Sequence, residues 1–375
     1  MIYADYGATS IHKPIEVIQA VQDVLCGVYG NPSRGAHDAA HAALRLLDES
    51  RETLAQYFGL KNYLNLGFTP SSTYALNLAI KGSLTQSDHA ITTFWEHNSA
   101  LRPLYQTGCA LSILPKDAAG RPDIRQLPDL LRPNTKALVM NLMSNVTGNV
   151  LDIKSVKQFA KEKDLLLILD ASQYAGVCSL RLNEDFPRTL VAITGHKSLY
   201  GPQGVGALLS HGVHRLRPQN SGGSGVHSFD RVHPDYFPDV CEVGTVNLPG
   251  IAGLAAAARC MEKIADGSQR LQTLRRTFYH LLQGIEGLSI YGSLPEGAAT
   301  LSLNIADMPS QTVSEILNDR YQIATRAGAH CAPLLHEAFG TVQQGMVRFS
   351  FGLHSSMEDV RCCTQAVEEI ARNRG

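Results

Sequence analysis

The sequence lacks any apolar run of the about twenty residues that a helix needs to cross a bilayer. Its first ten residues have neither a basic flank nor a long apolar stretch, so we expect no secretory signal. The formal net charge is only -1, which provides no bulk electrostatic attraction to nucleic acid or to an anionic membrane. These absences predict a cytoplasmic protein that binds neither nucleic acid nor a membrane.

The eight cysteines include no Cys-x-x-Cys pair. We therefore expect neither a disulfide framework nor a structural zinc site, and reduced thiols agree with a cytoplasmic location. His330, Cys331 and His336 could be considered as metal ligands, but no fourth ligand follows at a suitable spacing. The sequence predicts no metal.

Apolar strand-like runs alternate with helical patterns from about residue 60 to residue 250, which is typical of a parallel sheet covered by helices. After Gly250 the pattern changes to helices around short strands, which indicates a small α+β domain. We expect a large domain at residues 15–250, a small domain at 251–375, and an N-terminal segment, 1–14, that packs with the small domain. The predicted strands of the large sheet are Asn62–Leu66, His89–Thr93, Ala110–Leu114, Lys136–Asn141, Leu165–Asp170, Thr189–Thr194 and Val205–Ser210.

Two residues of opposite charge stand where predicted strands end. Asp170 closes the fifth strand, and Lys197 follows the sixth in the segment Thr194-Gly-His-Lys197. A lysine amine can bind the aldehyde of pyridoxal phosphate (PLP), and a carboxylate can keep the pyridine nitrogen protonated, so that the ring accepts electrons. The pair therefore predicts PLP, although an exposed loop lysine is the plainer explanation of any single lysine.

Other polar residues belong to the same edge of the sheet, because open α/β sheets bind ligands at the carboxyl ends of their strands. Ser71, Ser72 and Thr73 precede a helical run whose free amides suit a phosphate group, or they simply cap that helix. His97 follows a strand and could stack on the pyridine ring and move protons, although a lone histidine is more often structural.

Further candidates lie on loops and near the C-terminus. Asn145 and Gln173 could contact the ring hydroxyl of the cofactor, or they could form turns. Arg326 and Arg348 suit the carboxylate of an amino acid, and a buried ion pair is the alternative for Arg348. Cys331 lies in a loop of small residues, where we expect an accessible thiol that can act as a nucleophile.

Four segments, in this order, resemble the class V aminotransferase family, and within it the cysteine desulfurase and selenocysteine lyase branch. They are Asp170-Ala-Ser-Gln173, Thr194-Gly-His-Lys197, Glu242-Val-Gly-Thr-Val-Asn247 and Arg326-Ala-Gly-Ala-His-Cys331. The resemblance covers nearly the whole chain, and the short loop of Cys331 is similar to that of the group II desulfurases. It implies an α/β protein of PLP-dependent transferase fold type I, in which a large domain with a mainly parallel seven-stranded sheet is joined to a small α+β domain.

The resemblance also implies roles for single residues. Lys197 would hold PLP, Asp170 would pair with the pyridine nitrogen, and Cys331 would attack the sulfur of the substrate. The protein would be a homodimer in which Thr245 reaches the partner's site. The remaining implied contacts are Ser71, Ser72, Thr73, Thr194 and His196 for the phosphate, Gln173 and Asn145 for the ring oxygen, His97 for the ring face, and Arg348, Arg326 and Asn145 for the substrate.

We therefore expect a PLP-dependent cysteine desulfurase that acts on L-cysteine or selenocysteine. It would release alanine and leave a persulfide on Cys331, from which an acceptor thiol or protein could collect the sulfur. The alternatives are a β-lyase that cleaves cystine or selenocysteine, an aminotransferase that does not require the cysteine, and a non-catalytic scaffold. Ala329 and Ser33 stand where members of this branch often carry histidine, which changes the expected substrate pocket.

Overall fold

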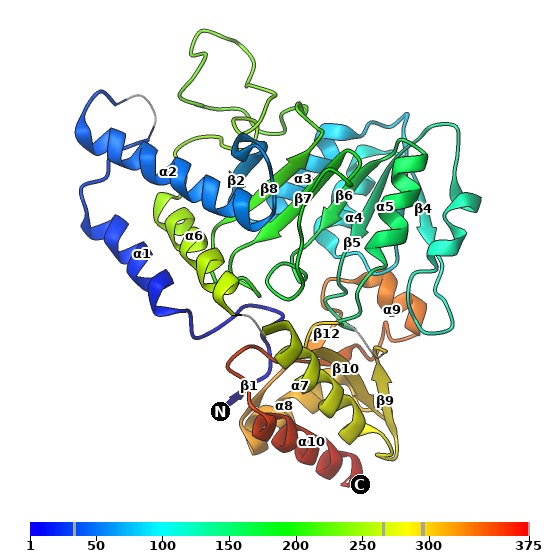
Figure 1. The fold of residues 1–375 in the computed structure, drawn as a ribbon. Coiled ribbons are helices and arrows are strands. Elements are labelled where there is room, and N and C mark those ends of the chain that lie inside the picture. The colour runs from blue at the N-terminus through cyan, green and yellow to red at the C-terminus, as the bar shows by residue number, and fades with distance from the viewer. Residues whose placement is uncertain (33–34, 265–266, 294–296, 374–375) are drawn as a thin grey trace.

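The computed structural model describes residues 1–32, 35–264, 267–293 and 297–373, so Ser33 lies outside the described residues. Two bodies make up the chain (Figure 1): a large sheet with helices on both faces, and a smaller body formed by the C-terminal elements. The N-terminus lies beside the smaller body. In the described part of the chain, no helix is both long and apolar enough to span a membrane.

The large sheet has seven strands in the order β2-β8-β7-β6-β5-β3-β4. All neighbours from β4 to β7 run parallel, whereas β8 is antiparallel to both β7 and β2. The expectation of a mainly parallel seven-stranded sheet is therefore confirmed. The strands are β2 Leu66–Thr69, β3 His89–Thr93, β4 Ala110–Leu114, β5 Thr135–Asn141, β6 Leu166–Asp170, β7 Thr189–Thr194 and β8 Gly206–His211.

The position predicted for the first strand, Asn62–Leu66, is wrong. The side chain of Asn62 accepts a hydrogen bond of 3.0 Å from the amide of Leu64 and begins a short 3-10 turn at Tyr63–Asn65. An asparagine that bonds to nearby amides in this way competes with strand pairing. The strand therefore starts at Leu66, where the alternative local bonds end, and continues to Thr69.

Successive residues of β6 show how both faces of the sheet are covered. Leu167 and Leu169 join the core beneath helices α2, α5 and α6, while Leu166 and Ile168 join the core beneath α3 and α4. Since both faces are buried, the strands are apolar along their whole length instead of alternating with polar residues. The helices are α1 Ile15–Cys26, α2 Asp38–Tyr57, α3 Ser72–Ser83, α4 Asn98–Thr107, α5 Ile153–Glu162 and α6 Leu248–Lys263.

The smaller body contains a four-stranded antiparallel sheet in the order β12-β13-β10-β9. The N-terminal strand β1 (Ile2–Tyr3) pairs with β11 (Ile323–Ala324) of the same body. Helix α6 continues through residue 250 and packs on α1 and α2, and the domain boundaries remain a prediction. The elements are α7 Gly267–Leu282, β9 Leu288–Tyr291, β10 Thr300–Ile305, α8 Ser310–Tyr321, β12 Arg326–Gly328, α9 Pro333–Phe339, β13 Met346–Ser350 and α10 Met357–Arg372.

Gly176 packs closely against the backbone of the loop that follows Lys197. Its φ is +91°, and a Cβ atom there would lie 2.1 Å from the carbonyl oxygen of Ser198. Gly284 has a similar φ of +87° but open space around it, so it is a matched control. We expect Gly284→Ala to cost about 1 kcal/mol for the strained φ alone. Gly176→Ala should cost about 2–4 kcal/mol in total, because the loop must also move. Equal losses in melting temperature would contradict the crowding of this loop.

Candidate active site

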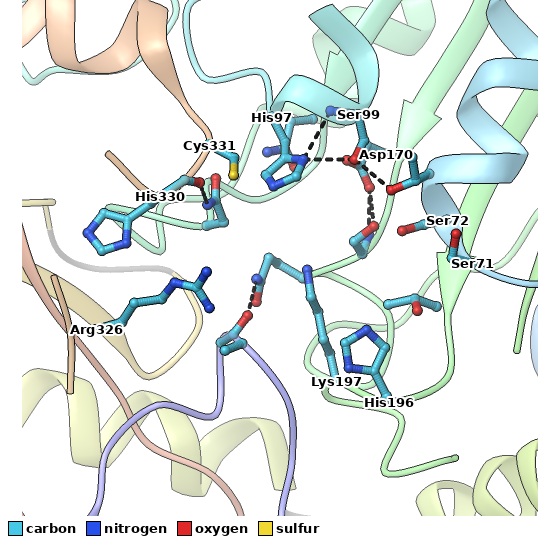
Figure 2. A pocket seen from close by; sticks show the side chains of 18 of the residues that line it. Ser71, Ser72, His97, Ser99, Asp170, His196, Lys197, Arg326, His330 and Cys331 are labelled. Carbon is cyan, nitrogen blue, oxygen red and sulfur yellow. Dashed lines mark hydrogen bonds between the residues drawn. The ribbon is translucent and has the colours of Figure 1, made fainter. Parts of the chain in front are cut away.

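A pocket of about 240 Å³ lies at the carboxyl ends of the strands of the large sheet, between that sheet and the smaller body (Figure 2). It brings together residues separated by up to a few hundred positions in the sequence. Thr245 is the one predicted residue that does not line it. The predicted residues that do are Ser71, Ser72, Thr73, His97, Asn145, Asp170, Gln173, Thr194, His196, Lys197, Arg326, Cys331 and Arg348.

Asp170 is the last residue of β6, directly beside β7, the strand that leads to Lys197. Its Oδ1 accepts hydrogen bonds from the amide of Ser172 (2.9 Å) and from the hydroxyl of Ser172 (2.5 Å). These bonds fix the orientation of the carboxylate and use only one of its two oxygens. No described residue bonds to the other oxygen, Oδ2, so it can accept from a donor that enters the pocket.

The Lys197 side chain is half-buried and points into the pocket (Figure 2). Burial lowers the pKa of Lys197 to about 8, although the negative charge of Asp170 acts in the opposite direction. A sizeable fraction of the amine is therefore neutral in mildly alkaline solution. The neutral amine is the form that attacks a carbonyl group.

One end of the pocket has the donors that a phosphate group needs. The hydroxyl of Ser71 accepts a hydrogen bond from the amide of Tyr74 (3.3 Å) and caps α3, whose first-turn amides begin at Ser72. Within the described residues, the Thr194 hydroxyl is buried and makes no hydrogen bond, although it borders the pocket. Helix-start amides and an unsatisfied hydroxyl fit a dianionic phosphate.

Two histidines of the pocket are neutral at pH 7. Burial, and then the positive charge of Lys197, lower the pKa of His97 to about 4. The same two causes lower the pKa of His196 to about 4. Nδ1 of His196 lies 3.1 Å from the hydroxyl of Thr9, and His97 caps helix α4. Neither imidazole adds a positive charge to the pocket at rest.

Asn145 and Gln173 are both tied to the pocket wall. Asn145 donates from Nδ2 to the carbonyl oxygen of His330 (2.9 Å), and Gln173 donates from Nε2 to that of Gly7 (2.8 Å). Among the described residues, Oδ1 of Asn145 is buried and has no hydrogen-bond partner. It can accept a hydrogen bond from a ring hydroxyl, which agrees with the chemistry of PLP.

The two arginines of the pocket differ in what they already bind. Arg348 is buried in β13, where Nη2 lies 2.6 Å from Oδ1 of Asp5 and Nη1 donates to the carbonyl oxygen of Asn145 (3.1 Å). This is the ion pair that the sequence left open as the alternative for Arg348. Arg326 lies opposite Arg348 in the register of β12 and β13, is exposed, and points its guanidinium into the pocket (Figure 2).

Cys331 is exposed, as the sequence predicted, on the loop between β12 and α9. Its carbonyl oxygen accepts a hydrogen bond from the amide of Asn98 (2.7 Å), which ties the loop to the start of α4. His330 and Cys331 have φ values of +49° and +55°, a left-handed conformation that side chains rarely adopt. Such strain at consecutive residues is typical of functional loops that their surroundings hold in place.

Several residues at or near the pocket had no role in the sequence prediction, among them Asp5, Glu96 and Ser99. Glu96 is fully buried next to His97, and its Oε1 accepts from the hydroxyl of Thr93 (2.7 Å) and the amide of Asn141 (2.9 Å). Burial, aided by the negative charge of Asp170 and opposed by these hydrogen bonds, raises the pKa of Glu96 to about 8. The sequence offers little signal for Glu96, because it precedes the polar run His97-Asn98-Ser99, where an acid is expected to be exposed.

Comparisons with known proteins agree over nearly the whole chain. The model of the Aminotransferase class-V family matches residues 2–362. A probable cysteine desulfurase of Vibrio cholerae is 30% identical, with 98% of this chain and 93% of that protein covered. The cysteine desulfurase CsdA of Escherichia coli is also 30% identical, with the same coverage of 98% and 93%. The apo structure of a cysteine desulfurase from Thermococcus onnurineus has a TM-score of 0.91 at 27% identity and covers 99% of this chain and 94% of its own.

The buried carboxyl of Glu96 makes a testable contribution to the pH dependence of stability. Its pKa is raised from 4.5 to about 8, so between these values the folded protein keeps a proton that the unfolded chain loses. This group therefore lowers the stability of the wild type as pH rises, by at most about 1.4 kcal/mol per pH unit. Glu96→Gln removes the effect, so the melting temperature of the variant relative to wild type should increase from pH 5 to pH 8.

Glu52→Gln, on the exposed side of helix α2, is the control for this measurement. Its melting temperature should follow that of the wild type at every pH. A difference between Glu96→Gln and wild type that stays constant with pH would show that Glu96 is ionised in the folded protein.

Proposed function

The chain belongs to the aminotransferase class-V family, and from that membership we propose that it is a PLP-dependent cysteine desulfurase. The observation that supports this best is the meeting of Lys197, Asp170 and Cys331 in one pocket, although they come from three separate parts of the chain. Its relatives and structural neighbours that carry the name cysteine desulfurase cover almost all of its length. The proposed substrate is L-cysteine, and the same site would suit selenocysteine.

The pocket suits PLP at each of its functional groups. When bound, PLP supplies an aldehyde that links to an amine and a protonated ring that accepts electrons from the Cα atom of the substrate. Lys197 would hold the aldehyde, and Oδ2 of Asp170 would accept from the pyridine nitrogen. Ser71, Ser72, Thr73, Thr194 and His196 would hold the phosphate, Asn145 and Gln173 the ring hydroxyl, and His97 the ring face.

Lys197 would also carry protons for the bound substrate. Its amine, whose pKa burial lowers to about 8, can then take a proton from Cα and return it to the carbon skeleton. The pH range in which Lys197 is neutral therefore limits the rate on the acidic side.

Cys331 would take the sulfur. Its thiolate attacks the substrate sulfur, an S–S bond forms, and the Cβ–S bond breaks with its electron pair returning to the carbon skeleton. Protonation of that skeleton gives alanine, and a persulfide stays on Cys331 until an acceptor thiol or protein removes the outer sulfur. The exposed position of Cys331 suits both the attack and the transfer.

Arg326 and Arg348 would hold the substrate carboxylate, together with Asn145. Arg348 is already neutralised by Asp5, so the exposed guanidinium of Arg326 has the larger unbalanced charge. A fork of two donors on a planar group matches a carboxylate in both geometry and charge.

We also propose a homodimer with Thr245 near the partner's pocket. Thr245 is exposed and lies on a loop, where its Oγ1 is 3.5 Å from Nδ2 of Asn31. Helix α1 and the residues after it carry exposed apolar side chains, with Leu25 70% and Val28 82% exposed. Apolar side chains concentrated in this way favour a protein interface.

The experiment that tests the function is turnover of L-cysteine with alanine, pyruvate and sulfide all quantified. Wild type should give alanine, and Cys331→Ala should lose at least about 100-fold in alanine formation, because it lacks the thiol that lines the pocket. Cys362→Ala, which removes a partly exposed thiol of helix α10 that does not line the pocket, should behave as wild type. Pyruvate and ammonia that persist in Cys331→Ala would indicate a β-lyase, and a protein that does not bind PLP would indicate a scaffold.

A further inference from the structure

Three side chains form a hydrogen-bonded chain from the middle of the pocket to its phosphate end. Nδ1 of His97 lies 2.9 Å from the hydroxyl oxygen of Ser99, and that oxygen lies 2.7 Å from the hydroxyl oxygen of Thr73. Ser99 belongs to the first turn of α4 and Thr73 to the first turn of α3. Figure 2 shows Ser99 bonded to His97 on the side away from Cys331.

The protonation state of His97 follows from one bond in this chain. The backbone amide of Ser99 donates to Nδ1 of His97 over 3.1 Å. An amide N–H can only donate, so Nδ1 has no proton, and the neutral ring carries its proton on Nε2. His97 therefore presents a donor at Nε2 while it is neutral, and it is neutral at pH 7 because burial lowers its pKa to about 4.

The hydroxyls of Ser99 and Thr73 have one hydrogen each. The direction in which these hydroxyls donate depends on whether an acceptor lies next to Thr73 at the phosphate end. With no acceptor at the phosphate end, Thr73 can donate to Ser99, and Ser99 can donate to Nδ1 of His97. A phosphate oxygen accepts only, so the Thr73 hydroxyl would turn to donate to it. The Thr73 oxygen then accepts a hydrogen bond from the Ser99 hydroxyl. The Ser99 hydroxyl hydrogen therefore no longer points at Nδ1 of His97, and a lone pair of the Ser99 oxygen faces Nδ1 instead.

We propose that Ser99 is a positioning residue that couples the phosphate end of the pocket to the basicity of His97. Its backbone amide fixes the Nε2–H form, and its hydroxyl reverses direction when a phosphate group occupies the residues around Thr73. Occupancy then makes Nδ1 of His97 easier to protonate, so the imidazole becomes a better proton carrier only when the cofactor end is filled. This coupling rests on the proposed function, since it takes Ser72, Thr73 and Thr194 to be the phosphate site.

Selective ¹⁵N labelling of the histidines tests the coupling without any turnover. Spectra at pH 7 are taken with and without inorganic phosphate, and then with pyridoxal 5'-phosphate, for wild type, Ser99→Ala and Ser99→Thr. His97→Gln assigns the resonance among the 14 histidines. All three proteins should show the Nε2–H form, because the backbone amide at residue 99 is present in each.

On addition of phosphate, the Nδ1 resonance of wild type and Ser99→Thr should move toward the value of a ring nitrogen that has lost a hydrogen bond. Ser99→Ala should show a much smaller movement, due only to the charge of the phosphate. Equal movement in Ser99→Ala and wild type would overturn the coupling alone. Binding of phosphate is monitored by ³¹P spectra and binding of pyridoxal 5'-phosphate by absorbance. If neither binds, the phosphate site is wrong, and the coupling is wrong with it.

Discussion

The amine of Lys197 is held out of bulk water beside the carboxylate of Asp170, and the rest of the site depends on this pairing. The two residues follow neighbouring parallel strands, β6 and β7, whose register brings their carboxyl ends together. Desolvation lowers the pKa of the amine, and the carboxylate limits that effect, so the lysine is reactive without losing its charge altogether. An exposed lysine would be protonated, and an isolated buried lysine would be costly to keep.

Most other titratable groups around the pocket are neutral or paired, so they add little charge next to Lys197 and Asp170. His97 and His196 are neutral at pH 7, and the buried carboxyl of Glu96 keeps a proton up to about pH 8. Arg348 is compensated by Asp5, which the N-terminal segment carries into the smaller body. What remains is a pocket with unused donors at its phosphate end and one exposed guanidinium, the charge pattern that an anionic cofactor and an amino-acid carboxylate require.

The parts of the site that follow strand ends could be predicted from the sequence, because strand ends fix where side chains collect. Asp170, Lys197 and His97 are residues of this kind. The strands could also be predicted, apart from the first, where Asn62 caps a turn. The contact of Arg348 with Asp5 spans 343 positions, and the sequence offers no local pattern for it. The hydroxyl of Ser99 is similar, since its role depends on how α3 and α4 approach one another.

The attachment of PLP to one lysine is the claim that the whole account depends on. Its most direct measurement is reduction of the PLP-loaded protein with borohydride, followed by peptide mapping by mass spectrometry. The account predicts a pyridoxyl phosphate adduct on Lys197 in high yield. An adduct confined to exposed lysines such as Lys61, or no adduct at all, would contradict it.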